Sequence, residues 1–199
     1  MAAERRDGVP DDDPVTRWAL AAGRGDPAAT TRFVRHTEDV VRRFLAHLNG
    51  QADVDDLVQE TYLRAWRNLP GFTGRSSALT WLLVIARRVA IDHVRAARVR
   101  PRTTSLEQIP GVTDWRDDAC ATSARSDDTV LVRRLLAELD PARREAFVLT
   151  QLLGMSYAEA AHISQCPIGT IRSRVARARD DLIAALSASD EHRHYRTAG

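Results

Sequence analysis

Four arginines, Arg172, Arg174, Arg177 and Arg179, lie within eight residues near the end of a chain whose formal net charge is only +2. The sequence contains no lysine, so every strongly basic side chain is an arginine. The planar guanidinium group donates paired hydrogen bonds to phosphate oxygens or to the major-groove edge of guanine. The cluster therefore indicates recognition chemistry, with phosphates and base edges as the ligands.

The residues before this cluster predict a helix, a tight turn and a second helix. Gly154 stands where one helix should stop, and Ser156 with Glu159 forms a capping box that starts the next. Pro167 then favours the start of the second helix. Gln165 lies in the turn, at a position where glycine is the relaxed choice for a positive φ.

The second helix has two different faces. Its apolar residues recur at steps of three and four and should face a core: Ile168, Ile171, Val175, Ala178 and Leu182. The far side carries small, hydroxyl and basic residues: Gly169, Thr170, Ser173, Arg174 and Arg177, with Arg172 and Arg179 on a flank. A major groove accepts such a face, which predicts a DNA-binding helix-turn-helix. The alternative is an ordinary amphipathic helix with solvated arginines.

A second candidate surface lies on the helix predicted at 53–69. One face is apolar and should pack in a core, through Val54, Leu57, Val58, Thr61, Tyr62, Ala65, Trp66 and Leu69. The outer face places Leu63 among Asp56, Gln59, Glu60 and Arg67. A single exposed leucine is normal on any protein. A basic and apolar partner helix would nevertheless fit this surface.

The segment "PGFTGRSSALTW" predicts a flexible loop that leads into a helix starting near Ala78. That helix should bury Trp81, Leu82, Ile85, Ala86, Val89 and His93, while Arg87, Arg88, Arg95 and Arg98 project elsewhere. Basic side chains beside such a loop could hold a single strand with one base displaced from its stack. We interpret His93 as a packing residue, because no nucleophile or metal ligand is paired with it by spacing.

The chain as a whole predicts an all-α protein of two small helical domains. A period near 3.6 recurs through 15–100 and 129–186, and no strand-like alternation appears. Residues 103–129 hold six acidic residues and two arginines, whereas 87–102 hold six arginines and one aspartate. We expect 101–128 to be a flexible linker, and 1–14 and 187–199 to be disordered tails.

The composition argues against several classes of protein. No apolar run reaches 18 residues and the N-terminus lacks a signal-like stretch, so we expect a cytoplasmic protein with no membrane contact. Cys120 and Cys166 have no metal-ligand spacing, and we expect no metal and no cofactor. Because the sequence lacks paired carboxylates, a His/Cys cluster and a phosphate loop, a nucleic-acid enzyme is disfavoured.

Three motifs together resemble the extracytoplasmic-function (group IV) sigma factors of bacterial RNA polymerase, which belong to the sigma-70 family. They are "DVDDLVQETYLRAW", "FTGRSSALTWLLVIARRVAIDHVR" and "GMSYAEAAHISQCPIGTIRSRVARAR", in that order. The resemblance covers about 15–186. It implies a sigma-2 domain at 15–100 and a sigma-4 domain with the helix-turn-helix at 129–186.

The resemblance also implies a role for each candidate surface. Core polymerase would bind at its β′ clamp through Asp56, Gln59, Glu60 and Leu63, and a further contact would involve the β flap. The −10 element would be held by the loop and the helix after it, through Phe72, Thr73, Gly74, Arg75, Ser76, Arg87, Arg88 and Arg95. The −35 element would be read by Thr170, Arg172, Ser173, Arg174 and Arg177.

One position departs from the family. Members commonly have asparagine where this chain has Arg88, so no −10 sequence preference follows from the resemblance. Members also often have an anti-sigma inhibitor, which adds such a protein to the implied partners besides polymerase and promoter DNA.

The resulting hypothesis is a non-enzymatic sigma factor that binds core polymerase, recognises two promoter elements and helps to melt DNA. Joining two weak DNA-binding domains on one polymerase raises their effective concentration at a promoter. The rival hypothesis is a helix-turn-helix regulator that acts as a dimer without polymerase, and such a protein should protect a palindrome on its own.

Overall fold

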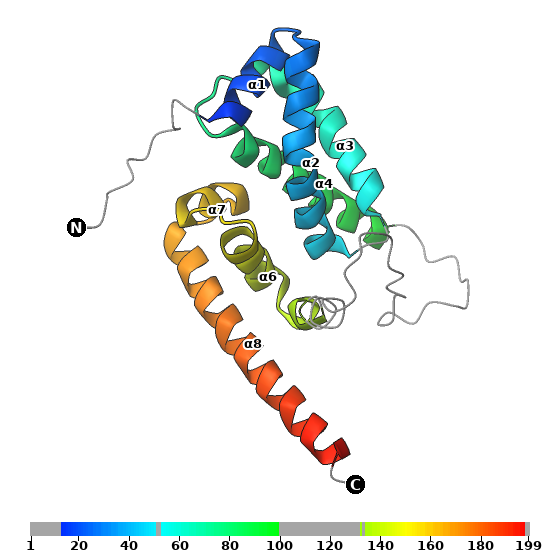
Figure 1. The fold of residues 1–199 in the computed structure, drawn as a ribbon, viewed down its shortest axis with the longest axis vertical. Helices are drawn as coiled ribbons and strands as arrows, with labels where there is room; N and C mark the ends of the chain where they lie inside the picture. The colour runs from blue at the N-terminus through cyan, green and yellow to red at the C-terminus, as the bar shows by residue number, and fades with distance from the viewer. Residues whose placement is uncertain (1–12, 51–52, 100–131, 133, 198–199) are drawn as a thin grey trace, which may run out of the picture.

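The computed structural model describes residues 13–50, 53–99, 132 and 134–197. These ranges contain no strand, and their elements are α1 (Pro14–Gly23), α2 (Pro27–Asn49), α3 (Val54–Asn68), η1 (Leu69–Gly71), α4 (Ala78–Val99), α6 (Pro141–Phe147), η2 (Val148–Leu152), α7 (Tyr157–Ser164) and α8 (Ile168–Thr197). Figure 1 shows α1 to α4 in one body, α6 and α7 beside it, and α8 extending away as a rod. The all-helical fold predicted from the sequence is confirmed.

Three helices begin with an aspartate followed by a proline. The carboxylates of Asp13, Asp26 and Asp140 accept hydrogen bonds from backbone N–H groups in the first turns of α1, α2 and α6. The proline that follows each cap lacks an N–H group and already has a helical φ. The same device therefore sets the starts of all three helices.

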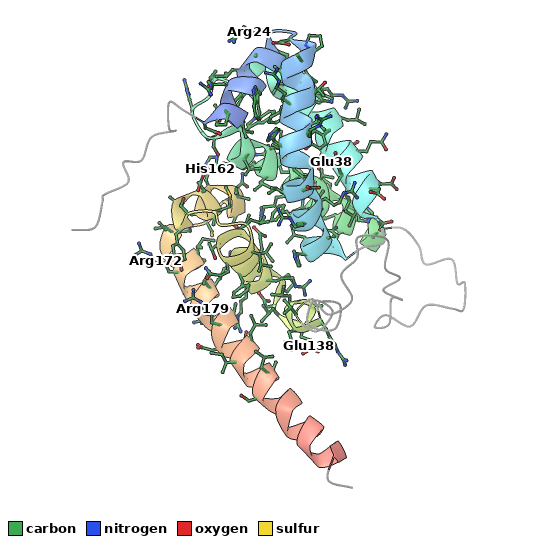
Figure 2. All side chains as sticks on the ribbon, viewed as in Figure 1. Arg24, Glu38, Glu138, His162, Arg172 and Arg179 are labelled. Carbon is green, nitrogen blue, oxygen red and sulfur yellow. The ribbon has the colours of Figure 1, made fainter. Side chains whose placement is uncertain are left out.

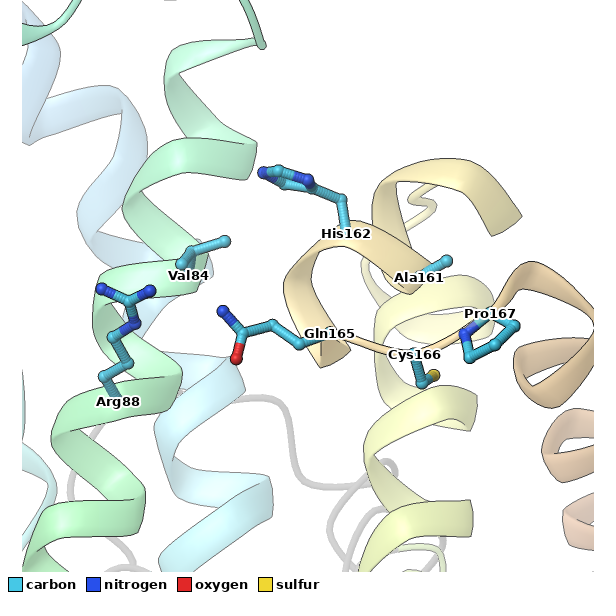
Figure 3. Close-up of a pocket in the computed structure, with 7 residues that line it drawn as sticks. All are labelled: Val84, Arg88, Ala161, His162, Gln165, Cys166 and Pro167. Carbon is cyan, nitrogen blue, oxygen red and sulfur yellow. The ribbon is translucent and has the colours of Figure 1, made fainter.

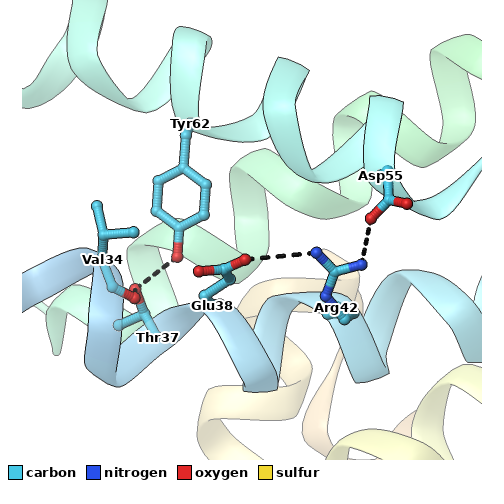
Figure 4. A network of polar contacts seen from close by, with 6 residues as sticks. All are labelled: Val34, Thr37, Glu38, Arg42, Asp55 and Tyr62. Carbon is cyan, nitrogen blue, oxygen red and sulfur yellow. Dashed lines mark hydrogen bonds and ion pairs between the residues drawn. The ribbon is translucent and has the colours of Figure 1, made fainter. Parts of the chain in front are cut away.

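Contacts between α2 and α3 fix the orientation of α3 in the N-terminal body. The hydroxyl groups of Thr37 and Tyr62 lie 2.7 Å apart, and Thr37 also donates to the carbonyl of Phe33. Arg42 on α2 pairs with Asp55 near the start of α3 (Figure 4). Because α3 is held from its inner side, its outer side remains available to solvent.

The C-terminal body is built around the start of α8. Leu136 and Leu139 pack with Ala178 in a small buried cluster. Arg143 on α6 pairs with Asp181 on α8 at 2.6 Å. Between α6 and α7 the chain makes one π-helical segment, η2, and then turns at Gly154, whose φ is +68°. The stop predicted at Gly154 is confirmed.

The two bodies pack directly on each other. α4 lies against α7 and α2 against α6, and buried apolar side chains of both bodies form one continuous cluster. The sequence predicts two domains but gives no sign of this contact, because it joins residues far apart in the chain. The predicted linker at 101–128 lies outside the described residues.

α8 continues to Thr197, and the disorder expected for 187–199 stays a prediction. The segment contains no proline, and its only glycine is Gly199, so no residue of low helix propensity ends the helix earlier. The expectation that His93 packs in the core is wrong, since its side chain is 39% exposed and bonds to Asp53 at 3.1 Å.

Candidate nucleic-acid and partner interfaces

The predicted helix-turn-helix is present and its turn is fixed locally. Ser156 and Glu159 form the reciprocal capping box at the start of α7. Gln165 ends α7 in the left-handed conformation, with φ 52° and ψ 47°, and it is the only non-glycine residue with positive φ in the described part of the chain. Backbone N–H groups of Thr170 and Ile171 then donate to the carbonyl of Pro167, which starts α8.

The apolar face of α8 is confirmed with one exception. Ile171, Val175 and Ala178 are buried, and Leu182 is half-buried. Ile168 was expected in the core but is 40% exposed. It occupies the first position of the helix, directly after the turn.

The opposite face of α8 carries the predicted DNA-binding side chains. Arg172, Ser173 and Arg177 are exposed, whereas Thr170 and Arg174 are half-buried. Figure 2 shows Arg172 projecting outward from the helix. The Arg174 guanidinium lies 3.6 Å from the Cys166 sulfur, which steadies it near the turn. The exposed face of α8 thus presents guanidinium donors and a hydroxyl group that can bond to base edges or phosphates.

The outer face of α3 combines an exposed leucine with acidic groups, as expected. Leu63 is 43% exposed, and Asp56 and Gln59 are exposed beside it. Glu60 is half-buried and accepts a 2.7 Å bond from Arg64. Arg64 also donates to Asp92 at 2.6 Å. The hydrogen bond to Asp92, and to a smaller extent the one to Glu60, raises the pKa of Arg64. The sequence pattern did not reveal this ion-pair network.

The predicted loop before α4 is held by α1. The backbone N–H of Ala78 donates to the Thr16 hydroxyl at 2.8 Å, and α4 begins at Ala78 as expected. Gly74 has a φ of +72°, and a Cβ atom there would lie 3.5 Å from Leu20. Phe72 rests on Trp81 with ring centroids 5.0 Å apart.

The loop side chains differ in exposure: Thr73 and Arg75 are exposed, whereas Phe72 and Ser76 are half-buried. An aromatic ring beside exposed polar groups can support a stacked base. The geometry therefore suits the predicted contact with single-stranded DNA.

The three candidate arginines of α4 have different surroundings. Arg87 donates through Nε to Glu145 on α6 at 2.7 Å, and its side chain is only 20% exposed. Arg88 is exposed and lines a pocket between α4 and the turn before α8, together with Val84, Gln165 and Pro167 (Figure 3). Arg95 is exposed. Glu145 was missed at the sequence level, because no local pattern pairs it with Arg87.

The described residues contain no group of three or more His, Cys, Asp or Glu side chains arranged to hold a metal ion. None of the described helices has the length and hydropathy needed to span a membrane.

Comparison with known proteins identifies the family of the chain. Residues 33–100 match the Sigma-70 region 2 family and 129–182 match Sigma-70, region 4. The chain is 48% identical over 180 residues to the ECF RNA polymerase sigma factor SigC of Mycobacterium tuberculosis, covering 90% of this chain and 95% of the relative. It is 32% identical over 166 residues to the ECF RNA polymerase sigma-E factor of Escherichia coli K12, covering 80% and 87%.

Two solved structures share the fold. CnrH, in complex with the cytosolic domain of CnrY, aligns with a TM-score of 0.67 and 27% identity over 88% of this chain and 99% of that one. The sigma factor RpoE of Bartonella quintana, in complex with the anti-sigma factor NepR, aligns with a TM-score of 0.66 and 28% identity over 79% and 96%.

The two Sigma-70 regions matched by this all-helical chain define the class of transcription initiation factors. This chain is a member of the extracytoplasmic-function sigma factors of the sigma-70 family. It is an alternative sigma factor that binds core RNA polymerase and directs promoter recognition, DNA melting and transcription initiation. Sigma factors are non-enzymatic, and the dimeric regulator considered above is not supported.

Proposed function

We propose that this sigma factor binds its partners through three separate surfaces: the outer face of α3, the loop at 72–76 with α4, and the exposed face of α8. The outer face of α3, with Asp56, Gln59, Glu60 and Leu63, binds the coiled coil of the β′ clamp. An exposed leucine in an acidic ring fits a helix that is apolar and basic. A regulator that acts only on DNA needs no such face, so this exposed surface is the observation that carries the proposal.

The loop at 72–76 and the arginines of α4 take the non-template strand of the −10 element. Phe72 provides an aromatic platform, supported from behind by Trp81. Arg87, Arg88 and Arg95 supply positive charge along the adjacent helix. Stacking together with phosphate contacts suits a strand whose bases have left the duplex.

The exposed side of α8 reads the −35 element in the major groove, through Thr170, Arg172, Ser173, Arg174 and Arg177. The sigma-2 domain extends over 15–100 and the sigma-4 domain over 129–186. The acidic segment between them lies in the channel through which the RNA transcript leaves polymerase, because its negative charge resembles that of RNA. The C-terminal domain also contacts the β flap of polymerase. The protein acts in the cytoplasm. An anti-sigma protein is a further partner, as in the solved complex of RpoE with the anti-sigma factor NepR.

Reversing the acidic charge on α3 tests the docking surface. Asp56→Arg with Glu60→Arg should abolish co-purification with core polymerase, because the variant presents four units of added positive charge to a basic partner. Asp39→Arg with Glu138→Arg is the matched control, since both residues are exposed and lie outside the proposed surfaces. Circular dichroism should report the same helix content in all three proteins. Unchanged polymerase binding by the α3 variant would refute the docking surface.

A further inference from the structure

One guanidinium group on α3 is shared between the polymerase-docking face and α4. Arg64 donates through Nε to Oε1 of Glu60 at 2.7 Å and through Nη1 to Oδ2 of Asp92 at 2.6 Å. Glu60 lies one helical turn earlier on α3, whereas Asp92 lies on α4, 28 positions further along the chain. A single side chain therefore joins a carboxylate of the proposed docking face to a carboxylate outside that face.

The two hydrogen bonds use different nitrogen atoms of Arg64, so both form at once. A guanidinium group presents its N–H donors in a rigid planar fork, which allows it to bridge two carboxylates. Because α3 packs against α4, Glu60 and Asp92 both stay within reach of that fork. The one positive charge of Arg64 is thus divided between two negative groups.

The three side chains together carry one net negative charge. Glu60 and Arg64 alone would sum to zero, and a basic partner would then gain little attraction from Glu60. Asp92 supplies the second carboxylate, and its hydrogen bond raises the pKa of Arg64 more than the bond to Glu60 does. Asp92 therefore draws the positive charge toward α4 and leaves negative charge available on the docking face.

All three groups are accessible to solvent and to a partner. The side chains are 35% exposed for Arg64, 42% for Glu60 and 52% for Asp92. Ion pairs at this level of exposure contribute little to the stability of a fold. The network can therefore rearrange at low cost when a basic group approaches Glu60.

We propose that Arg64 and Asp92 are positioning residues for polymerase docking: Asp92 holds Arg64 toward α4 and leaves Glu60 able to pair with a basic group of the β′ clamp. This inference rests on the proposed role of the outer face of α3. Arg64 by itself opposes docking, because it neutralises Glu60 and repels a basic partner. Asp92 favours docking although it lies on the helix that carries the candidate −10 arginines.

The test measures the affinity of the full-length chain for purified core RNA polymerase. Asp92→Asn should weaken binding about two- to fivefold, the range for one exposed ion pair, because Arg64 then neutralises Glu60. Arg64→Gln should tighten binding by a similar factor, because it frees Glu60 and removes a like charge. The effect of Asp92→Asn should disappear in the Arg64→Gln background, since Asp92 acts through Arg64.

The opposite signs separate positioning from a structural role. Asp92→Asn and Arg64→Gln break the same ion pair, so a purely structural contribution would shift both affinities in the same direction. Asp92→Glu keeps the negative charge and should retain the wild-type affinity. Raising the salt concentration from about 0.1 to 1 M should reduce the differences between variants, because exposed charges are then screened within about 3 Å.

Asp53→Asn is the matched control. Asp53 is 52% exposed, like Asp92, but pairs with His93, so the variant removes the same charge without disturbing Arg64. It should bind core polymerase with the wild-type affinity. Circular dichroism should report the same helix content for every variant.

Three results would overturn the positioning proposal. One is wild-type affinity for Asp92→Asn. Another is an equal loss for Asp92→Asn and Asp53→Asn, which a general change in charge would explain. The third is a loss for Asp92→Asn that persists in the Arg64→Gln background. Failure of the wild-type chain to bind core polymerase would instead count against the proposed function.

Discussion

In the C-terminal body the turn before α8 is fixed by residues that are close in the sequence, whereas in the N-terminal body the loop before α4 is fixed by a residue far away in the sequence. Ser156 and Glu159, three positions apart, form the capping box of α7, and Gln165 ends that helix in the left-handed conformation. Ala78, by contrast, bonds to Thr16 across 62 positions. The difference shows that a DNA-facing surface can be built from local signals or from tertiary contacts, and only the first kind can be predicted in detail from the sequence.

Charging the buried face of α8 gives the largest expected effect and tests the local half of the comparison. Ile171 has no exposed surface, so Ile171→Asp would bury an unpaired carboxylate and should destabilise the C-terminal body by more than about 4 kcal/mol. Thermal unfolding followed by circular dichroism measures this. Leu63→Asp is the control, because Leu63 is 43% exposed and should tolerate the charge. A normal melting transition for Ile171→Asp would show that the face is wrongly assigned.

The contact between α2 and α3 predicts a pH effect specific to the N-terminal body. Burial raises the pKa of Tyr62 from 10.0 to about 12, although its hydrogen bond with Thr37 acts in the opposite direction. The folded state therefore holds this proton more tightly, and the associated stability is complete below pH 10 and lost as pH rises toward 12. The loss should be about 2 kcal/mol. Urea unfolding across this range measures it.

Tyr62→Phe should remove that pH dependence, at a cost of about 1 kcal/mol at neutral pH for the lost hydrogen bond. Thr37 keeps its bond to the Phe33 carbonyl in the variant, so its hydroxyl is not left unsatisfied. An identical pH dependence in the variant would mean that Tyr62 does not ionise in this range.

Truncating Arg174 tests whether the α8 face reads bases. Arg174→Ala should weaken binding of the holoenzyme to a promoter with guanine at the contacted position by about 1–3 kcal/mol, and should weaken binding less where another base stands there. Competition binding on a set of single-base −35 variants measures the difference. An equal loss on every sequence would mean that Arg174 contacts phosphate alone.

The turn itself gives the smallest effect. Gln165→Gly should stabilise the C-terminal body by roughly 0.5–1 kcal/mol, because glycine adopts a φ of 52° without the clash of a Cβ atom. Gly154→Ala is the reciprocal control and should destabilise the C-terminal body by about 1 kcal/mol, because alanine is disfavoured at a φ of +68°. No atom lies within 4 Å of the added Cβ, so this cost comes from the backbone conformation alone. Melting temperatures that move the other way would contradict the strain assigned to this turn.

The sequence predicted the helices, the capping box, the positive φ at Gln165 and the exposed leucine on α3, because each depends on residues within a few positions. It did not predict that Glu145 meets Arg87, since 58 positions separate them and neither has a local partner that signals the pair. The position of Ile168 was wrong for a related reason: helical periodicity gives a direction but not the limit of the packed surface. Long-range contacts thus decide which predicted residues are accessible.

The most direct test of the account is run-off transcription with purified core polymerase and a pool of genomic upstream fragments. We expect discrete transcripts that depend on the added chain and that disappear with the Asp56→Arg and Glu60→Arg variant. The absence of any transcript above core polymerase alone, on every fragment, would contradict the assignment of this protein as a promoter-directing subunit.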